Sequence, residues 1–358
     1  MKVALITRTT LYSTPGGDTI QIQQTASQLK ALGIDADVLP ADAEIDYERY
    51  DLLHFFNITR PADILQHQRA SGKPSVISTI LVDYSEFDRK HRPGLSGIIF
   101  NLLPADSIEY LKAIARFVRK KDKLNSVDYL WKGQRRSMHE VLSKAALILP
   151  NSHSEYRRIV KKYGTNMPHM IVPNGINPEL FVDNGSPKDE NLVLCVARIE
   201  GLKNQLNLIR ALNNTRFRLL IIGAHSANQL AYYEACRREA AANVQFIDHI
   251  PQQELLAYYQ RAKVHVLPSW FETTGLSSLE AAAMGCNLVI TDKGDTRDYF
   301  SDDAWYCDPQ STQSIYDNIV AASRQPYRQR LRQYLLENCT WQQAARITLN
   351  AYQTILSS

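Results

Sequence analysis

The sequence has few cysteines, no long apolar run and little excess of charge of either sign. Its five cysteines stand at wide and irregular spacings, which fit neither a disulfide framework nor a zinc site, so we expect reduced thiols in a cytoplasmic protein. No window approaches the roughly 18 apolar residues of a membrane span, and the first residues are apolar too briefly for a signal peptide. The formal net charge of +4 is too small to indicate a nucleic-acid partner. These absences predict a soluble globular protein.

Several catalytic signatures are absent as well. The nine histidines include no H-E-x-x-H pair, and no carboxylates cluster at metal-ligand spacing, so we expect no metal site. Neither the G-x-S-x-G nucleophile elbow nor the G-x-x-x-x-G-K-S/T phosphate loop occurs. His54 ends an apolar run, and we interpret it as a structural rather than a catalytic residue. Covalent hydrolases and P-loop enzymes are therefore disfavoured.

Short apolar runs alternate with segments of helical spacing along most of the chain, which is typical of parallel sheets covered on both faces by helices. The alternation is interrupted by a mainly helical stretch at 96–143 and begins again near Asn191. Residues 172–191 are rich in Pro, Asn, Gly and Asp, as a linker is. A chain of 358 residues is also long enough for two domains. The sequence thus predicts an α/β fold of two doubly wound units, whose ligands bind beyond the carboxyl ends of the strands.

The segment FETTGLSSLEAAAMG, residues 271–285, carries two glutamates eight positions apart. It follows the apolar run VHVLPS, and its second half consists of strong helix formers. The backbone amides from Thr274 to Leu276, at the predicted first turn, could hold a phosphate. Glu272 and Glu280 could then accept the hydroxyls of a sugar and of a ribose, which suits a nucleotide sugar. Taken as an arbitrary pair, two such glutamates are more often solvated surface charges.

Two further patterns lie at the ends of predicted strands. Arg198 and Lys203 stand five residues apart between an apolar run and a helical stretch, where two cations could clamp a diphosphate. Gly16 and Gly17 follow the first apolar run and Gly223 ends another, so that the backbone could approach a ligand closely at these points. Each pattern by itself is more often a set of scattered surface cations or a simple turn.

Taken together and in order along nearly the whole chain, these motifs resemble those of the retaining glycosyltransferases of family 4, which have the GT-B fold. The resemblance rests on the Gly-Gly loop, NSHSE at 151–155, VPNGIN at 172–177, the Arg–x4–Lys pair, the E-x7-E pair and the C-terminal TWQQAARITLNAYQTIL. The segments TDKGDTRDYF and YCDP are similar to those of bacterial surface-polysaccharide transferases. The resemblance implies two Rossmann-like domains facing across a cleft. Residues 1–170 would bind the acceptor, with a C-terminal helix at about 341–358 crossing back onto them, and residues 171–340 would bind the nucleotide sugar.

The resemblance also implies a metal-independent hexosyltransferase that needs no cofactor. It would retain the anomeric configuration by front-face attack, in which the leaving phosphate helps to deprotonate the acceptor. The expected donor is GDP-mannose or a UDP-hexose, and the expected acceptor is a glycan or lipid-linked saccharide in the synthesis of O-antigen, capsule or exopolysaccharide. The implied catalytic residues are Glu272 at the donor sugar, Arg198 and Lys203 at the diphosphate, and Asp83. The implied donor-binding residues are Gly16, Gly17, Gly223, Thr273, Thr274, Gly275, Leu276 and, at the ribose, Glu280.

The sequence departs from the family in the loop where many members carry a histidine. Here VISTILVDYSEFDRK offers Asp83 instead, which we expect to contact the outer hydroxyl of the sugar. A second feature is the segment 112–136, which interleaves nine basic side chains with apolar ones. This pattern suits peripheral contact with the anionic inner face of the cytoplasmic membrane. A solvated helical face is the alternative interpretation.

Two other functions stay open at this point. A GT-B-like epimerase acting on a nucleotide sugar would need acid–base residues beside the sugar but not the E-x7-E arrangement. It would convert a donor supplied without acceptor into its epimer. A non-catalytic protein that binds nucleotide sugars would give no turnover with any acceptor.

Overall fold

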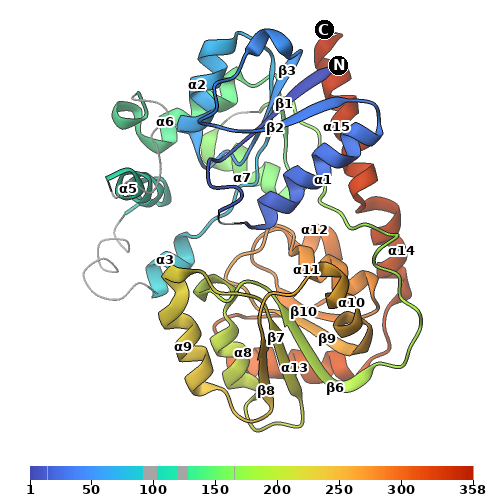
Figure 1. Ribbon diagram of the computed structural model, residues 1–358. Coiled ribbons are helices and arrows are strands. Elements are labelled where there is room, and N and C mark those ends of the chain that lie inside the picture. The colour runs from blue at the N-terminus through green and yellow to red at the C-terminus, as the bar shows by residue number, and fades with distance from the viewer. Residues whose placement is uncertain (14, 92–102, 119–127, 165, 358) are drawn as a thin grey trace. The chain divides into compact units, whose positions relative to one another are not determined.

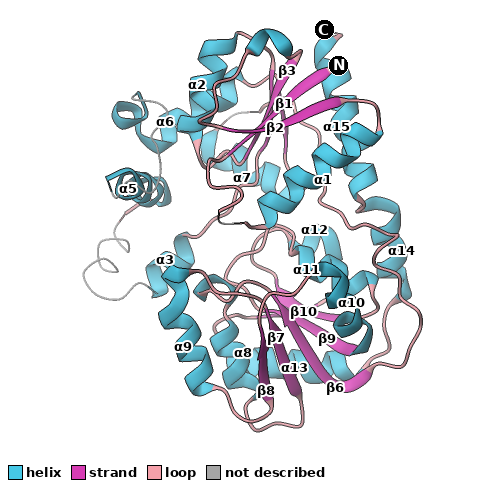
Figure 2. Cartoon of the chain, viewed as in Figure 1, coloured by secondary structure: helices cyan, strands magenta, loops and turns pink. Residues whose placement is uncertain are grey.

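The computed structural model describes residues 1–13, 15–91, 103–118, 128–164 and 166–357 (Figure 1). It divides the chain into two compact units. The first unit comprises Met1–Asn174 together with Trp341–Ser358, and the second comprises Gly175–Thr340. Each unit contains one sheet whose paired strands are all parallel, with helices packed around it (Figure 2).

The sheet of the first unit has the strand order β2-β1-β3-β4-β5. Its strands are β1 (Lys2–Thr7), β2 (Asp35–Pro40), β3 (Leu52–Phe56), β4 (Ser75–Ser78) and β5 (Leu147–Leu149). Every residue of the central strand β3 is buried, because helices cover both faces of a parallel sheet. The order is that of one common type of doubly wound fold, in which the direction of winding changes between β1 and β3.

The helices of the first unit come from both ends of the chain. They are α1 (Gly17–Ala31), η1 (Tyr47–Arg49), α2 (Pro61–Ser71), α3 (Ser85–His91), α5 (Ala105–Val118), α6 (Asp128–Lys144), α7 (His153–Tyr163) and α15 (Trp341–Leu356). The last of these, α15, packs against α1 and β5 (Figure 1). The hydroxyl of Tyr352 in α15 lies 2.6 Å from Nδ1 of His54 in β3, and Nε2 of His54 lies 2.9 Å from Oγ of Ser78. His54 is thus a buried structural residue, as its place in the sequence predicts.

The sheet of the second unit has the strand order β11-β10-β9-β6-β7-β8, which is the order of the Rossmann fold. Its strands are β6 (Asp189–Val196), β7 (Arg218–Ile222), β8 (Val244–Ile247), β9 (Ala262–Leu267), β10 (Asn287–Thr291) and β11 (Trp305–Cys307). From β6 the chain winds outward through β7 and β8, and from β9 it winds the other way through β10 and β11. The switch point therefore lies between β6 and β9, and the loops after these strands are where such a sheet holds its ligand.

The helices of the second unit follow the strands in alternation. They are η2 (Gly201–Lys203), α8 (Gln205–Leu212), η3 (Ala227–Gln229), α9 (Leu230–Glu239), α10 (Gln252–Arg261), α11 (Leu276–Ala283), α12 (Thr296–Phe300), α13 (Thr312–Arg324) and α14 (Gln329–Asn338). The residues of β6 alternate between two cores: Leu192 and Leu194 join one, Val193 and Cys195 the other. This period of two is what a strand buried on both faces requires.

Some elements differ from the sequence-based expectation. Strand β6 begins at Asp189, three residues before the apolar run at Leu192, because Asp189 pairs with Ala262 across a register shift. The edge strand β11 is only three residues long, too short for its pattern to stand out.

All five cysteines are buried free thiols. Among the described residues no helix is long and apolar enough to cross a membrane.

Candidate functional site

The two loops at the switch point of the second unit carry the predicted cations and the first glutamate. Arg198 and Lys203 follow β6, and Glu272 follows β9. Because β6 and β9 are neighbours in the sheet, their carboxyl ends bring these loops together. The backbone confirms the contact: the amide of Trp270 donates to the carbonyl of Leu202 at 2.8 Å.

Lys203 and Glu272 form an ion pair between the two loops. The ammonium of Lys203 contacts Oε1 of Glu272, and the hydroxyl of Ser269 donates to the same oxygen at 2.7 Å. Only 7% of the Glu272 side chain and 19% of the Lys203 side chain are exposed. The spacing in the sequence placed both residues at strand ends, but it did not reveal that they bind each other. Ser269 was not predicted at all, since a serine three residues before a glutamate carries no distinctive signal.

An asparagine fixes the cation-bearing loop on its neighbour. Asn204 has a positive φ of 61° and caps both η2 and α8. Its buried side-chain amide donates to the carbonyls of Pro268 at 3.1 Å and Pro309 at 2.7 Å. The residue therefore holds the end of η2, including Lys203, against the loop that leads to Glu272.

A third loop, after β10, encloses the backbone of Glu272. The amide of Glu272 donates to the carbonyl of Lys293 at 3.0 Å, and the amide of Asp295 donates to the carbonyl of Glu272 at 2.9 Å. Gly294 lies between these contacts with a φ of +108°, and a Cβ there would come within 2.0 Å of the Glu272 carbonyl oxygen. Only glycine permits this approach, so the loop after β10 sets the position of Glu272 as closely as its own loop does.

The start of α11 is the predicted phosphate site. Gly275 is its N-cap, with a left-handed φ of 73°, and the first backbone hydrogen bond runs from the amide of Ser278 to the carbonyl of Gly275 at 2.8 Å. The amides of Leu276 and Ser277 precede that bond, so they stand where a helix leaves its N–H groups without intrahelical acceptors. Thr273 and Thr274 form the short connection back to Glu272. The predicted segment from Glu272 to Leu276 is therefore one continuous loop and helix start.

Glu280 lies buried in α11, not on a solvated helix face. The hydroxyl of Tyr259 donates to its Oε2 at 2.9 Å, and the side-chain amide of Gln252 donates to its Oε1 at 2.7 Å. Burial raises the pKa of Glu280 to about 7, although both hydrogen bonds act to lower it. Sequence reasoning found Glu280 by its spacing from Glu272, but it missed both partners, which come from a different helix, α10.

Two predicted residues of this unit stand somewhat apart from the ion pair. The guanidinium of Arg198 is half exposed and lies 3.1 Å from Oε1 of Glu200 rather than on Glu272. Gly223 ends β7 with a φ of +148°, and a Cβ there would come within 2.1 Å of the carbonyl oxygen of Ala197. A contact within the protein therefore requires glycine at this position, because the loop after β7 packs against the backbone that leads to Arg198.

The Gly-Gly loop of the first unit opens α1, after β1. Gly16 is the N-cap and Gly17 the first helical residue, and the amide of Gly16 donates to Oγ1 of Thr19 at 3.0 Å. The loop is anchored by Arg8, whose Nε and Nη2 donate to the two carboxylate oxygens of Asp18 at 2.6 and 3.0 Å. The two glycines thus lie at the switch point of their own sheet.

The loop that carries Asp83 has a strained backbone. Asp83 itself is exposed and accepts the amide of Ser85 at 2.9 Å. Upstream, the β-branched Ile80 has a φ of +46°, a conformation that costs on the order of 1–3 kcal/mol. Buried Glu155, the glutamate of NSHSE, holds this turn by accepting the hydroxyl of Thr79 at 2.5 Å and the amide of Leu81 at 2.6 Å. The NSHSE motif therefore supports the loop before Asp83, a role that its sequence did not indicate.

The basic segment 112–136 is only partly described, because residues 119–127 lie outside the described ranges. Lys112 is paired with Asp88 and Glu109, and Lys132 with Glu140, so these two cations are compensated within the protein. Among the described side chains of α5 and α6, the most exposed apolar one is that of Trp131, at 86%. It is accompanied by three further exposed apolar side chains, those of Leu111, Phe117 and Leu130.

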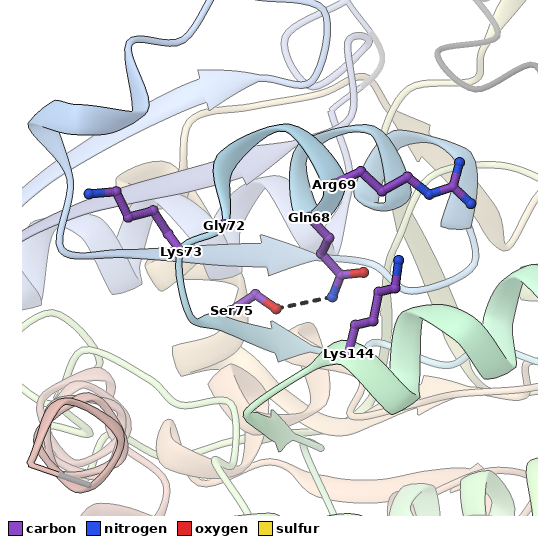
Figure 3. A pocket seen from close by; sticks show the side chains of 6 residues that line it. All are labelled: Gln68, Arg69, Gly72, Lys73, Ser75 and Lys144. Atoms are coloured by element: carbon purple, nitrogen blue, oxygen red, sulfur yellow. Dashed lines mark hydrogen bonds between the residues drawn. The ribbon is translucent and has the colours of Figure 1, made fainter.

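A hollow of about 460 Å³ lies in the first unit at the amino end of β4. It is lined by Gln68, Arg69, Gly72, Lys73, Ser75 and Lys144 (Figure 3). Arg69 and Lys144 both bind Glu140, at 2.8 and 3.1 Å. Although burial acts to raise the pKa of Glu140, hydrogen bonds from Lys132, Arg69 and Lys144 lower it to about 2. These cations are neutralised where they stand, and we assign no ligand to the hollow. Within the described ranges, no three His, Cys, Asp or Glu side chains gather as metal ligands would.

Residues 177–338, nearly all of the second unit but less than half of the chain, match the family described as "Glycosyl transferases group 1". The match therefore concerns the second unit, whose residues resemble a group 1 glycosyltransferase domain. The D-inositol 3-phosphate glycosyltransferase of Acidothermus cellulolyticus is 28% identical over 179 residues, which cover 43% of this chain and 40% of the relative. The chain therefore spans about two-fifths of the length of such a relative.

Two solved structures resemble the chain over its whole length. Sucrose-phosphate synthase of Thermosynechococcus elongatus gives a TM-score of 0.76 at 16% identity, covering 100% of this chain and 99% of that one. HepE of Anabaena in complex with UDP and glucose gives 0.69 at 12% identity, covering 99% of this chain and 100% of that one. At these identities the likeness concerns the fold, and it agrees with the predicted α/β fold of GT-B type with two Rossmann-like domains.

Proposed function

We propose that the protein is a retaining glycosyltransferase that moves a hexosyl unit from GDP-mannose or a UDP-hexose to a glycan or lipid-linked saccharide. The observation that carries the proposal is the buried Lys203–Glu272 pair, which stands at the switch point immediately before the start of α11. The group 1 domain supports sugar transfer, and the UDP and glucose in the HepE structure support a nucleotide-sugar donor. We place the reaction in the synthesis of O-antigen, capsule or exopolysaccharide.

In this proposal the second unit binds the donor along the loop that follows β9 and along α11. Glu272 accepts hydroxyls of the donor sugar, and the amides at the start of α11, from Thr274 to Leu276, bind the diphosphate. Lys203 and the half-exposed Arg198 neutralise the phosphates, so the reaction uses neither a metal ion nor a cofactor. Glu280 accepts the ribose hydroxyls at the other end.

The chemical step that we propose is a front-face substitution. The bond between the anomeric carbon and the diphosphate oxygen breaks, and Lys203 and Arg198 stabilise the charge that develops on the leaving phosphate. A phosphate oxygen takes the proton of the acceptor hydroxyl, whose oxygen bonds to the anomeric carbon on the same face. Glu272 does not act as the nucleophile in this scheme: Lys203 and the hydroxyl of Ser269 hold its Oε1, and the carboxylate accepts hydroxyls of the donor sugar.

We assign acceptor binding to the first unit. Asp83 is exposed at the end of the loop that Glu155 holds, and it is available to contact sugar hydroxyls. Gly16 and Gly17 offer backbone at the start of α1 for close approach by donor and acceptor.

The proposal is tested first by binding and then by turnover. A thermal-shift panel of GDP-, UDP- and dTDP-sugars identifies the donor, because a ligand that binds the native state raises the Tm. The donor is then incubated with glycan acceptors and wild type, K203M, E272Q or the control R210M. R210M removes the cation of an exposed ion pair with Glu239 in the same unit. We expect transfer by wild type and R210M, loss of at least about 100-fold in the other two, and retention of anomeric configuration by NMR.

Three outcomes would contradict the proposal. An epimerised nucleotide sugar formed from donor alone, without transfer to any acceptor, indicates an epimerase. Donor binding without turnover by the wild type on any acceptor indicates a non-catalytic binding protein. An inverted product anomer refutes the front-face step but leaves sugar transfer in place.

We further propose peripheral contact with anionic lipid at the inner face of the cytoplasmic membrane. The exposed apolar side chains of α5 and α6 support it, above all Trp131. Flotation with vesicles that contain phosphatidylglycerol, compared with vesicles of phosphatidylcholine alone, tests it. W131S should weaken flotation several-fold, and equal recovery of both proteins with both vesicles would refute the contact.

A further inference from the structure

One helix presents two different hydrogen-bond donors to the two oxygens of Glu280. Gln252 is the first residue of α10 and Tyr259 stands seven residues later, two turns on and on the same face. The amide of Gln252 donates to Oε1 at 2.7 Å, and the hydroxyl of Tyr259 donates to Oε2 at 2.9 Å. The carboxylate thus has one partner on each oxygen.

The two partners differ in how firmly they are held. Tyr259 is fully buried, and its carbonyl accepts Nζ of Lys188 at 3.0 Å and Sγ of Cys286 at 3.2 Å. Gln252 is an exposed residue at the surface end of the helix. The buried Tyr259 side chain therefore stays on Oε2 of Glu280, whereas the exposed Gln252 side chain can leave Oε1 and rotate into water at little cost.

The chemistry of a carboxylate leaves room for a ligand beside these partners. An ionised carboxylate has about four lone-pair sites and acts only as an acceptor. A vicinal pair of ribose hydroxyls supplies two donors. The partner of Oε1, Gln252, is exposed, and the partner of Oε2, Tyr259, is buried, so we take Oε1 as the oxygen that a ribose hydroxyl meets.

We propose that Tyr259 is a positioning residue that holds Oε2 of Glu280 in both the free and the bound protein. Gln252, in contrast, occupies on Oε1 the place that a ribose hydroxyl takes when a nucleoside diphosphate binds. The inference rests on the proposed function, since it takes Glu280 as the ribose-binding group. It adds Tyr259 as the permanent partner of Glu280 and Gln252 as the partner that a ligand displaces. It also makes ribose recognition depend on pH.

The pH dependence follows from the surroundings of the carboxylate. In the described part of the chain Glu280 forms no ion pair. Its ionisable partner is Tyr259, and the ionisable groups packed against Tyr259 are Cys286, Lys188 and His265, whose ring lies edge-on to that of Tyr259. Burial lowers the pKa of His265 to about 3, so it is neutral in the working range. Protonation of Glu280 itself near pH 7 converts one acceptor oxygen to a hydroxyl and removes the charge. Ribose recognition should therefore weaken as the pH falls through about 7.

The experiment compares UDP and GDP with their 2′,3′-dideoxy analogues by isothermal titration calorimetry between pH 6 and pH 9. The phosphates of each pair titrate alike, so the ratio of the two affinities reports the ribose hydroxyls alone. The variants are Y259F and Q252A. The control is Y258F, which removes the hydroxyl of the adjacent tyrosine; among the described residues that hydroxyl makes no hydrogen bond.

We expect the wild-type ratio to favour the ribonucleotide above pH 7 and to fall toward one below it. Y259F should lower the ratio about tenfold at pH 7.5 and move its midpoint to higher pH, because the lost hydrogen bond lowered the pKa of Glu280. Q252A should strengthen ribonucleotide binding about threefold, since a competing donor is removed. Y258F should behave as wild type.

A ratio that does not change with pH, or an unchanged ratio in Y259F, would overturn the role of Tyr259. A loss in Q252A as large as that in Y259F would show that Gln252 is a permanent tie between α10 and α11. If Y259F does not fold, the wild-type pH profile and the Q252A arm still decide the matter. Failure of every nucleotide to bind the wild type would refute the proposed function itself. Binding of nucleotide with a ratio of one at every pH would refute this inference and the ribose-binding role of Glu280, but it would leave the proposed sugar transfer in place.

Discussion

Replacing Lys203 by methionine should destabilise the protein through the carboxylate that it leaves behind. Glu272 would keep the hydroxyl of Ser269 as its partner but lose its counter-ion, with only 7% of its side chain exposed. Removing one member of a buried ion pair typically costs about 3–5 kcal/mol, because the remaining charge stays desolvated. E272Q should cost less, about 1–3 kcal/mol, since the Lys203 stem can carry its ammonium toward water.

The double variant K203M/E272Q contains no orphaned charge and should be more stable than K203M alone. We expect an interaction free energy of about 2–3 kcal/mol between the two sites, within the range for residues in direct contact. Activity should not follow stability: the double variant should remain without sugar transfer, because both proposed functions of the pair are lost. This divergence separates the structural role of the pair from its chemical role.

The assay is urea unfolding combined with native-state hydrogen exchange of β6 and β9, whose loops carry the two residues. The exposed pair Arg210–Glu239 is the matched control, with 46% and 35% of the side chains exposed. R210M should change the free energy of unfolding by less than about 1 kcal/mol. Additive effects of K203M and E272Q, or a K203M cost no larger than that of R210M, would refute the buried-pair reasoning.

Three further predictions concern other positions. G294A should lower the free energy of unfolding by about 2–4 kcal/mol and abolish transfer, because the new Cβ would overlap the carbonyl of Glu272. Hydrogen exchange in this loop of G294A at the rate of the wild type would contradict the prediction. His265 is neutral when folded, with its pKa lowered by burial from 6.5 to about 3, so the unfolded chain binds the extra proton and stability falls as the pH drops from about 6.5 toward 3. H265L should remove up to about 1.4 kcal/mol per pH unit from that slope in urea titrations, and an unchanged slope would exclude His265 as its source. E155Q should cost about 1–3 kcal/mol, because an amide N–H would face the amide of Leu81; an unchanged urea midpoint would count against this network.

The fold was predictable from the sequence because its central strands are buried on both faces. Runs such as LVLCV and VHVL need no alternation of polar residues, and the helices between them show their own period. The order of the strands could not be predicted from these patterns. It depends on the side of the sheet to which each crossover leads, and packing between segments far apart in the sequence determines that side.

The candidate site was predictable to the extent that its residues follow strands. Lys203, Glu272 and Glu280 were found because strand ends and helix starts can be located, and their types suit phosphate and hydroxyl groups. The contacts that hold them could not be found in the same way. Asn204, Gly294 and the partners of Glu280 belong to other loops and helices, and nothing local in the sequence marks a residue whose function is to fit a neighbouring loop.

The distribution of glycines shows how those loops depend on one another. Gly33 and Gly72 follow helices with a positive φ, and a Cβ at either would meet nothing within 4 Å. They serve the local turn alone. Gly223 and Gly294 follow strands, and a Cβ at either would collide with a backbone carbonyl of another loop at 2.1 and 2.0 Å. At these two points on the carboxyl edge of the second sheet the loops are therefore packed backbone against backbone. Backbone contacts of this kind limit how far the loops can move, so we expect the proposed donor site to be largely formed before a donor arrives.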